Sequence, residues 1–360
     1  MTGKNWGLLG HEWAVDLLRN QVKKGNIEHS YLLAGAPGIG RTTLALRFTQ
    51  VLNCQNPPEP GEACLECRNC IQIANKQFSD LLIVESDYEG AALKIENIRE
   101  AMHWLTLAPY QGNYRVAIFR RFHEAYGSQG AAENAMLKTI EEPSSRAIIF
   151  LLADSPEQLL PTTTSRCEVL RLRAPSVSDL QKYLLRQGSS QEEAEFLAHI
   201  SAGRPGYALS LRNSPDFLKQ RENWLNDLAS LLPAGRVKRF AYAEKLSKVR
   251  ISKKKNDEEE KDQDNEASLE LTNIPRQALE TWGSFWRDVM ITASGSQVPL
   301  VNIDRIAIIQ GLAKQLGFSK AKQVVLDIEK SIERMDRFVN VRLLLEVLLL
   351  KIPFVPNFEK

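Results

Sequence analysis

Residues 32–43 read Leu-Leu-Ala-Gly-Ala-Pro-Gly-Ile-Gly-Arg-Thr-Thr, an apolar run, a glycine-rich turn and the start of an amphipathic segment. The apolar run predicts the end of a buried strand and the last residues predict a helix, so the turn joins strand to helix. Its spacing fits the phosphate-loop pattern G-x-x-x-x-G-K-[ST], except that Arg41 stands where lysine is required. The residues of the pattern that remain are Gly35, Gly38, Gly40, Thr42 and Thr43. Backbone N–H groups of such a turn hold an anion at the helix N-terminus. The stretch therefore predicts a phosphate cradle, but without the compact ammonium that fits against the outer phosphates during hydrolysis.

The first half of the chain alternates short apolar runs with amphipathic helical stretches. The predicted strands are Ser30–Ala34, Leu81–Glu85, Arg115–Phe119, Ala147–Ala153 and Val169–Leu172. The predicted helices are Trp13–Lys23, Thr42–Leu52, Ile95–Leu105, Ala131–Glu141 and Pro156–Leu160. Strands that alternate with helices predict a parallel sheet covered on both faces, and we expect this α/β domain to span residues 1–174.

Beyond Pro175 the pattern is helical throughout. Helices are predicted at Ser176–Gln187 and at Ser190–Ala202, the second opened by a capping box between Ser190 and Glu193. They begin a small helical lid domain, expected at 175–245. A charged stretch without an apolar face follows and predicts a solvated linker or insertion at 246–267. An all-helical third domain is expected at 268–360, with helices at Ser268–Ser294, Ile303–Leu316, Ser319–Met335 and Val339–Leu350.

The overall charge gives no footprint of a protein that binds nucleic acid by itself. Lys and Arg number 46 against 44 Asp and Glu, a formal charge of +2. The obvious basic clusters are Arg120-Arg121 and Lys253–Lys255, and neither is interleaved with base-stacking aromatics. A zinc-stabilised DNA-binding module is therefore a weak alternative. The first residues lack the apolar core of a secretion signal and no run of 18 apolar residues suggests a membrane span, so we expect a cytoplasmic protein without membrane contact.

Four cysteines lie close together in the sequence, spaced C-x9-C-x2-C-x2-C. They are Cys54, Cys64, Cys67 and Cys70. Four thiolates are what a structural, tetrahedral Zn²⁺ site requires, and such a closed site leaves no position for catalysis. The polar, turn-rich residues between the first two cysteines predict a knuckle that protrudes from the fold. The alternative is a set of unliganded or redox-active thiols.

A phosphate loop that hydrolyses nucleotide also needs acidic residues after the next apolar strand, to hold magnesium and to orient water. Here the strand Arg115–Phe119 is followed by Arg120-Arg121. Asp80, Glu124 and Asp154 remain as substitutes, although the sequence places none of them well. One alternative is therefore an active ATPase in which Arg41 supplies the missing charge and Glu124 orients water.

Several motifs resemble the clamp-loader branch of the AAA+ ATPases. They are Asn134–Pro143 (NAMLKTIEEP), Ile148–Leu152, Leu159–Thr162 and Ser165-Arg166-Cys167, joined by Gly10-His11-Glu12 near the start and Asn340–Leu343 near the end. The resemblance covers nearly the whole chain. Within the clamp-loader branch, the chain is most similar to subunits of bacterial DNA polymerase III. It implies an AAA+ module with a zinc knuckle, a helical lid and an oligomerising helical collar. It also implies that Arg166, otherwise only a surface charge, is an arginine finger that reaches in trans to a neighbouring subunit's ATP.

The resemblance further implies a division of labour. In active siblings the lid carries a phosphate-sensing arginine where this chain has Gly206, with Arg204 nearby but out of register. Together with Arg41 and Arg120-Arg121, this predicts a non-hydrolysing subunit with no catalytic activity of its own. Its cofactors would be structural Zn²⁺ and, at the loop, ATP or ADP held without hydrolysis. Its partners would be gamma/tau and delta clamp-loader subunits and, through the complex, the sliding clamp and primer–template DNA.

Overall fold

The computed structural model describes residues 5–85, 93–122, 131–248, 274–335 and 340–356. These residues form two compact units. The first comprises Met1–Ser176 with Arg204–Tyr207, and the second comprises Val177–Gly203 with Ala208–Lys360. The lid and the C-terminal helices thus fall within one unit. The separate domain boundaries expected at 246–267 stay a prediction, because this stretch lies largely outside the described residues.

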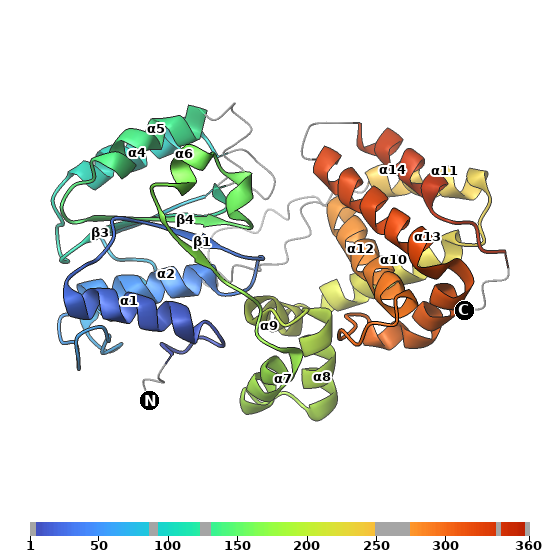
Figure 1. Ribbon diagram of the computed structural model, residues 1–360, viewed down its shortest axis with the longest axis horizontal. Helices are drawn as coiled ribbons and strands as arrows, with labels where there is room; N and C mark the ends of the chain where they lie inside the picture. Colours follow the sequence, from blue (N-terminus) through green and yellow to red (C-terminus); the bar gives the residue numbers. More distant parts are fainter. Residues whose placement is uncertain (1–4, 86–92, 123–130, 249–273, 336–339, 357–360) are drawn as a thin grey trace, which may run out of the picture. The chain divides into compact units, whose positions relative to one another are not determined.

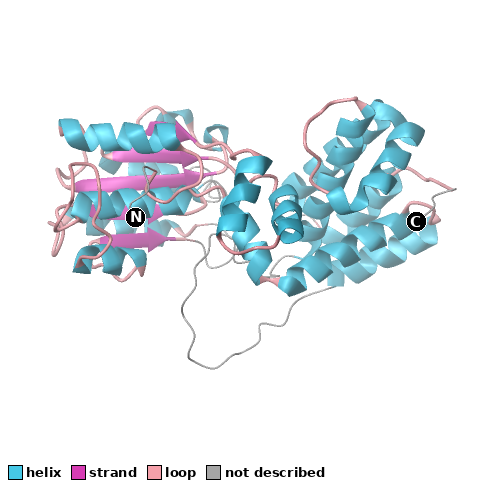
Figure 2. Ribbon diagram, turned by 90° about the horizontal axis from the view of Figure 1, so that it is seen from below, coloured by secondary structure: helices cyan, strands magenta, loops and turns pink. Residues whose placement is uncertain are grey.

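The first unit is built on a five-stranded parallel sheet, with its strands in the order β2-β3-β4-β1-β5 (Figures 1 and 2). The strands are β1 (Ser30–Ala34), β2 (Leu81–Val84), β3 (Arg115–Phe119), β4 (Ala147–Ala153) and β5 (Glu168–Arg171). Five apolar runs in the sequence therefore correctly predicted five strands and their parallel direction. Only β2 and β5 differ: β2 ends one residue earlier than predicted, and β5 begins and ends one residue earlier.

Helices cover both faces of this sheet, because successive residues of a buried strand point to opposite sides. In β3, Val116 and Ile118 join one apolar cluster, while Ala117 and Phe119 join the other. The first cluster packs against α1 (Glu12–Lys24), α2 (Arg41–Asn53) and α3 (Arg68–Ala74), and the second against α4 (Ile95–Thr106) and α5 (Ala131–Glu141). Figure 1 shows α1 and α2 on one side of the sheet and α4 and α5 on the other.

The carboxyl ends of the parallel strands bring the candidate functional residues to one edge. Residues 35–40 follow β1, Arg120 follows β3 and Asp154 follows β4, which is the neighbour of both β1 and β3. The short η2 (Pro156–Gln158) and α6 (Pro161–Thr164) come next in the chain and lead to Arg166. Ligands of open α/β sheets bind at this carboxyl edge.

The second unit is helical throughout its described residues (Figure 2). Its helices are α7 (Val177–Arg186), α8 (Gln191–Ile200), most of α9 (Pro205–Asn213), α10 (Pro215–Leu231), α11 (Arg236–Lys248), α12 (Ile274–Ala293), the short η3 (Ile303–Arg305), α13 (Ile306–Met335) and α14 (Val341–Lys351). α13 is interrupted at Gly317, whose φ of 72° is not helical, so the predicted separation of two helices near this point is confirmed. No helix among the described residues is both long and apolar enough to cross a membrane.

Candidate functional site

The glycine-rich turn has the geometry that its sequence predicts. Gly40 precedes α2 as its N-cap residue, and Gly38 has a φ of 76°. A Cβ at Gly38 would lie 2.8 Å from the Tyr207 backbone nitrogen, so a larger residue cannot replace this glycine without displacing the backbone. His11, at the start of α1, supports the turn because its Nε2 lies 3.0 Å from the Ile39 carbonyl oxygen. An N–H on Nε2 donates this hydrogen bond, since a carbonyl only accepts.

Residues 204–207 pack directly on the turn. The Gly206 N–H donates to the Gly38 carbonyl oxygen at 2.8 Å, and the Arg204 guanidinium lies 4.3 Å from the centroid of the Tyr207 ring. A Cβ at Gly206 would come 3.0 Å from that same carbonyl oxygen, which is a tight contact. Gly206 is therefore adjacent to the loop, and its backbone packs closely on that of Gly38.

Arg41 is committed to an internal partner. Its side chain is 4% exposed, and Nη1 donates to Asp154 Oδ1 at 2.9 Å. Its buried Nε has no hydrogen-bond partner among the described residues. Asp154 follows β4 directly, beside the end of β1, and its side chain is 34% exposed. Thr42 is buried and Thr43 is exposed. The cation of the loop thus faces a carboxylate of the chain itself.

A hydrolysing loop needs acidic residues after β3, but this chain has Arg120 there, in an ion pair with Glu85. Arg120 Nη1 donates to Glu85 Oε2 at 2.7 Å, and the Arg120 N–H donates to the Val84 carbonyl oxygen. Asp80 lies at the opposite edge, because it precedes β2. Its buried carboxylate accepts the N–H groups of residues 110, 111 and 112. Asp80 is therefore not a magnesium ligand of the loop, and Glu124 lies outside the described residues.

Arg166 lies two residues beyond α6, and its side chain is 38% exposed. Nη1 donates to the Thr162 carbonyl oxygen at 2.9 Å, and Nε lies 2.6 Å from Glu141 Oε1 at the end of α5. An ion pair between exposed side chains contributes only about 0–1 kcal/mol. The guanidinium can therefore leave Glu141 for a stronger anion at little cost. Cys167 beside it is partly buried, and burial raises the pKa of its thiol to about 12.

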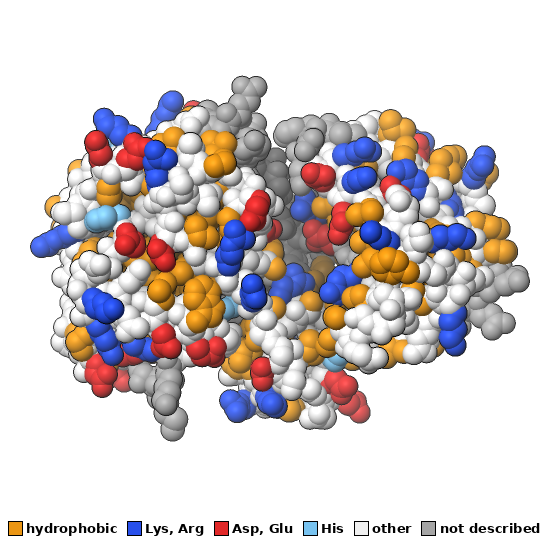
Figure 3. All heavy atoms as spheres, in the orientation of Figure 1, with side chains coloured by type: hydrophobic (Ala, Val, Ile, Leu, Met, Phe, Trp, Pro, Cys, Tyr) orange, Lys and Arg blue, Asp and Glu red, His pale blue; other side chains and the backbone are white. Residues whose placement is uncertain are grey.

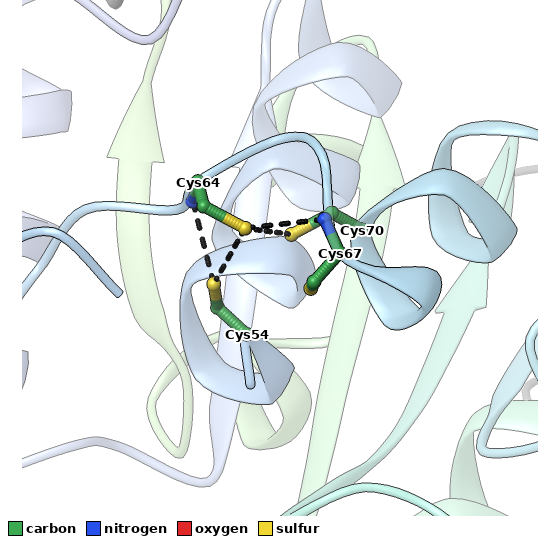
Figure 4. Close-up of side chains that lie close together, drawn as sticks. All are labelled: Cys54, Cys64, Cys67 and Cys70. Atoms are coloured by element: carbon green, nitrogen blue, oxygen red, sulfur yellow. Dashed lines mark hydrogen bonds between the residues drawn. The ribbon is translucent and has the colours of Figure 1, made fainter. Parts of the chain in front are cut away.

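The four predicted cysteines meet at one point (Figure 4). All four Sγ atoms lie within 4.8 Å of one another. The Sγ atoms of Cys54 and Cys64 are 3.4 Å apart, and those of Cys64 and Cys70 are 4.0 Å apart. Ligands at the usual Zn–S length of about 2.3 Å in a tetrahedron are separated by about 3.8 Å. The cluster therefore has the donor set and the size of a four-sulfur metal site.

Without a bound cation, burial opposes deprotonation of two of the four thiols. Burial raises the pKa of the Cys54 and Cys70 thiols above the ordinary value. Burial acts in the same direction on Cys67, but N–H groups of Gln55 and Cys70 outweigh it and lower the pKa of Cys67 to about 6. Several thiolates this close together repel one another, and a divalent cation removes the repulsion.

The cluster is part of the core and does not protrude from it, contrary to what the sequence indicated. Cys54, Ala63, Cys70 and Ile73 belong to the apolar cluster beneath the sheet, whereas the exposed residues of this segment are 55–60, 65–66 and 68. The unpredicted helix α3 explains this difference, because it carries Cys70 and Ile73 back against α2.

Two contacts at these sites have no signal in the sequence. Asp154 is 113 residues from Arg41, and spacing alone gave no reason to pair them. Glu133, on α5, is fully buried and holds α6 in place through Leu160 and Thr163. Only the folded sheet and its covering helices bring these residues together.

The sheet order, the phosphate loop between β1 and α2, and the attached helical unit define a P-loop module of the AAA+ class. Two family models match, one described as "DNA polymerase III, delta subunit" over residues 10–176 and one as its C-terminal part over residues 265–353. The chain belongs to this family of DNA polymerase III clamp-loader subunits.

Individual relatives agree with this family. The tau subunit of Bacillus subtilis is 26% identical over 354 residues, which are 96% of this chain and 60% of the relative. The delta' subunit of Pseudomonas aeruginosa is 30% identical over 197 residues, 54% of this chain and 59% of the relative. The chain thus spans about three fifths of the length of these relatives. A solved gamma-subunit-related protein from Thermotoga maritima is 16% identical with a TM-score of 0.44, and the match covers 94% of this chain and 98% of that one.

Proposed function

We propose that this chain is a non-hydrolysing clamp-loader subunit of the delta-prime type that supplies Arg166 in trans to the ATP of a neighbouring subunit. The observation that carries the proposal is the contrast between two arginines. Arg41 is buried and paired with Asp154, whereas Arg166 is exposed and held by an exposed ion pair with Glu141 and one hydrogen bond to the Thr162 carbonyl oxygen. Arginine fingers accelerate phosphoryl transfer by about 10³–10⁵-fold, because they stabilise charge that develops on the transferred group.

The chain's own loop is unsuited to hydrolysis for three independent reasons. Asp154 neutralises Arg41. After β3, Arg120 forms an ion pair with Glu85. Gly206 has no side chain with which to sense a phosphate. ATP or ADP would bind there without turnover, in competition with the Asp154 carboxylate. An active ATPase that uses Arg41 is the alternative, but the ion pair with Asp154 already neutralises the Arg41 charge that this alternative needs.

We assign Zn²⁺ to Cys54, Cys64, Cys67 and Cys70. The assignment rests on the four sulfur donors and on separations close to those of a tetrahedral site. A closed four-sulfur site leaves no open position for substrate, so the metal would stabilise the packing of α2 against α3. Neither hydrolysis nor the arginine finger depends on it chemically.

The proposed partners are gamma/tau and delta subunits, which would contact the C-terminal helices as a collar. α14 exposes an apolar stripe at Leu343, Val347 and Leu350, and apolar side chains are visible on the C-terminal helices in Figure 3. The spacing i, i+4, i+7 places all three on one helix face. The complex would act on the sliding clamp and primer–template DNA in the cytoplasm. On the face drawn in Figure 3, acidic and basic side chains are interspersed, as the net charge of +2 suggests.

Reconstitution tests the proposal. The chain is mixed with gamma/tau and delta subunits, and ATP hydrolysis is measured with clamp and primed DNA. Arg166→Ala should leave assembly intact and lower hydrolysis. Arg171→Ala is the matched control, because Arg171 also forms an ion pair in which both side chains are exposed, with Glu157, and should have no effect. Equal hydrolysis by both variants and the parent complex would refute the finger assignment.

A further inference from the structure

Glu133 of α5 is a fully buried carboxylate. Its Oε2 accepts two hydrogen bonds, from the Leu160 N–H at 2.9 Å and from Thr163 Oγ1 at 2.8 Å. Its buried Oε1 has no hydrogen-bond partner among the described residues. A carboxylate is costly to bury, and half of this one is unsatisfied, so packing alone does not account for it.

The two donors belong to the start of α6. This helix has only four residues, too few to be stable by itself, and its N-terminal N–H groups need partners. Leu160 is the N-cap residue, and its side chain cannot accept a hydrogen bond. Glu133 therefore accepts, from a different helix, the N–H of the N-cap residue and the hydroxyl of Thr163, and so ties the first turn of α6 to α5.

The backbone of Arg166 depends on this same turn. The Ser165 N–H donates to the Pro161 carbonyl oxygen at 2.9 Å, and the Arg166 N–H donates to that of Thr163 at 3.2 Å. The Arg166 side chain in turn donates to the Thr162 carbonyl oxygen. Carbonyl oxygens of residues 161–163 accept all three of these bonds, and the turn is tied to α5 at Leu160 and Thr163.

We propose that Glu133 is a positioning residue for Arg166: it holds Leu160 and Thr163 of the α6 turn against α5 and so fixes the direction in which the guanidinium leaves this chain. The inference rests on the proposed function of Arg166. A finger must meet a transferring phosphoryl group within a fraction of an ångström, so a loosened turn lowers the rate of the chemical step. The binding of ATP to the neighbour involves that neighbour's own loop and stays unchanged.

The test uses the reconstituted complex with gamma/tau and delta subunits, with clamp and primed DNA. Glu133→Leu removes both hydrogen bonds, and Glu133→Gln keeps an acceptor oxygen for them. We expect Glu133→Leu to remove most of the ATP hydrolysis that Arg166→Ala removes, through kcat, with the KM for ATP within about twofold of the parent. Glu133→Gln should restore most of it.

A double variant separates positioning from general stability. If Glu133 acts through Arg166, then Glu133→Leu combined with Arg166→Ala should hydrolyse ATP at the rate of Arg166→Ala alone. A further loss in the double variant would overturn the inference. So would a complex in which Glu133→Leu is as active as the parent although Arg166→Ala is impaired.

Thr163→Val keeps the inference testable if Glu133→Leu does not assemble. It removes one of the two hydrogen bonds with little change of volume, and we expect a smaller loss in kcat that again vanishes in the Arg166→Ala background. Full activity of an assembled Thr163→Val complex would contradict the inference. No effect of Arg166→Ala would contradict the proposed function itself, so the two failures are distinguishable.

Discussion

The ion pair between Arg41 and Asp154 leads to the most specific prediction about the loop. Removing one partner of a buried ion pair costs about 3–5 kcal/mol, because the other charge stays buried alone. Asp154 is 34% exposed, so solvent screens part of this, and Asp154→Ala should destabilise the start of α2 by roughly 1–3 kcal/mol. Because 1.4 kcal/mol is a factor of ten, amides in the first turns of α2 should exchange with deuterium about 5 to 150 times faster.

Phosphate provides the second half of this prediction. Without Asp154, the Arg41 guanidinium faces the cradle unneutralised, and an added anion can replace the carboxylate. Inorganic phosphate at 100 times its dissociation constant would restore about 2.7 kcal/mol and slow exchange again. The parent protein should respond little, because its own carboxylate already occupies the guanidinium.

Hydrogen–deuterium exchange with mass spectrometry on the full chain measures both effects at the peptides of α2. Asp154→Asn is the matched variant, since it keeps an acceptor and removes only the charge, and it should lie between the parent and Asp154→Ala. The reasoning is refuted if Asp154→Ala exchanges like the parent, or if phosphate protects both to the same extent.

The remaining predictions concern the metal, a buried arginine and pH. Protein purified without chelator should contain one zinc per chain, and Cys70→Ser should lose it and several kcal/mol of stability, measured by elemental analysis and thermal unfolding. Arg239→Met should destabilise the second unit by roughly 2–4 kcal/mol in urea unfolding, because the buried guanidinium donates to five backbone carbonyl groups. Burial alone would raise the pKa of Asp327, but the Lys351 ammonium and the Gln323 amide outweigh it and lower this pKa. The stability this gives is present above the unfolded pKa of about 3.9 and is lost as pH falls through the lowered pKa, so Asp327→Asn should flatten acid unfolding there.

Each of these has a control and a contradicting result. Cys167→Ser should keep its zinc, since Cys167 is not part of the cluster, and a metal-free parent protein with intact thiols would disprove the site. Arg239→Lys cannot span five carbonyl groups and should recover only part of the loss. Equal stability of Arg239→Met and the parent would contradict the structure of this network. An unchanged acid limb in Asp327→Asn would contradict the pH assignment.

The sheet was predictable because its strands are short apolar runs that need no knowledge of distant residues. The cysteines were predictable as a group for the same reason, since their spacing alone brings four sulfurs together. The contacts around the phosphate loop were not predictable from the sequence. Asp154 became the partner of Arg41 only because β4 lies beside β1, and Asp80 was excluded only because it precedes its strand and so lies at the wrong edge.

The helical parts show the same limit. The predicted helices end at Leu316 and begin again at Ser319, and the non-helical Gly317 lies in this gap, so the break was located correctly. Helix α3 was missed, and with it the burial of the metal cluster, because seven residues between cysteines and polar residues carry too little periodicity to indicate a helix. Glu133 was also missed, because a hydrogen-bond acceptor supplied from another helix leaves no pattern in the sequence around it.

We propose above all that this chain does not hydrolyse ATP itself and instead supplies Arg166 to ATP hydrolysis by a neighbouring subunit. ATP hydrolysis by the complex with gamma/tau and delta subunits, clamp and primed DNA tests it most directly, with two variants compared side by side. One is Arg166→Ala. The other combines Arg41→Met with Asp154→Leu, an exchange that leaves no buried charge. The account predicts that hydrolysis falls in Arg166→Ala and is unchanged in the second variant. Loss of hydrolysis in the Arg41–Asp154 variant with full activity in Arg166→Ala would contradict it.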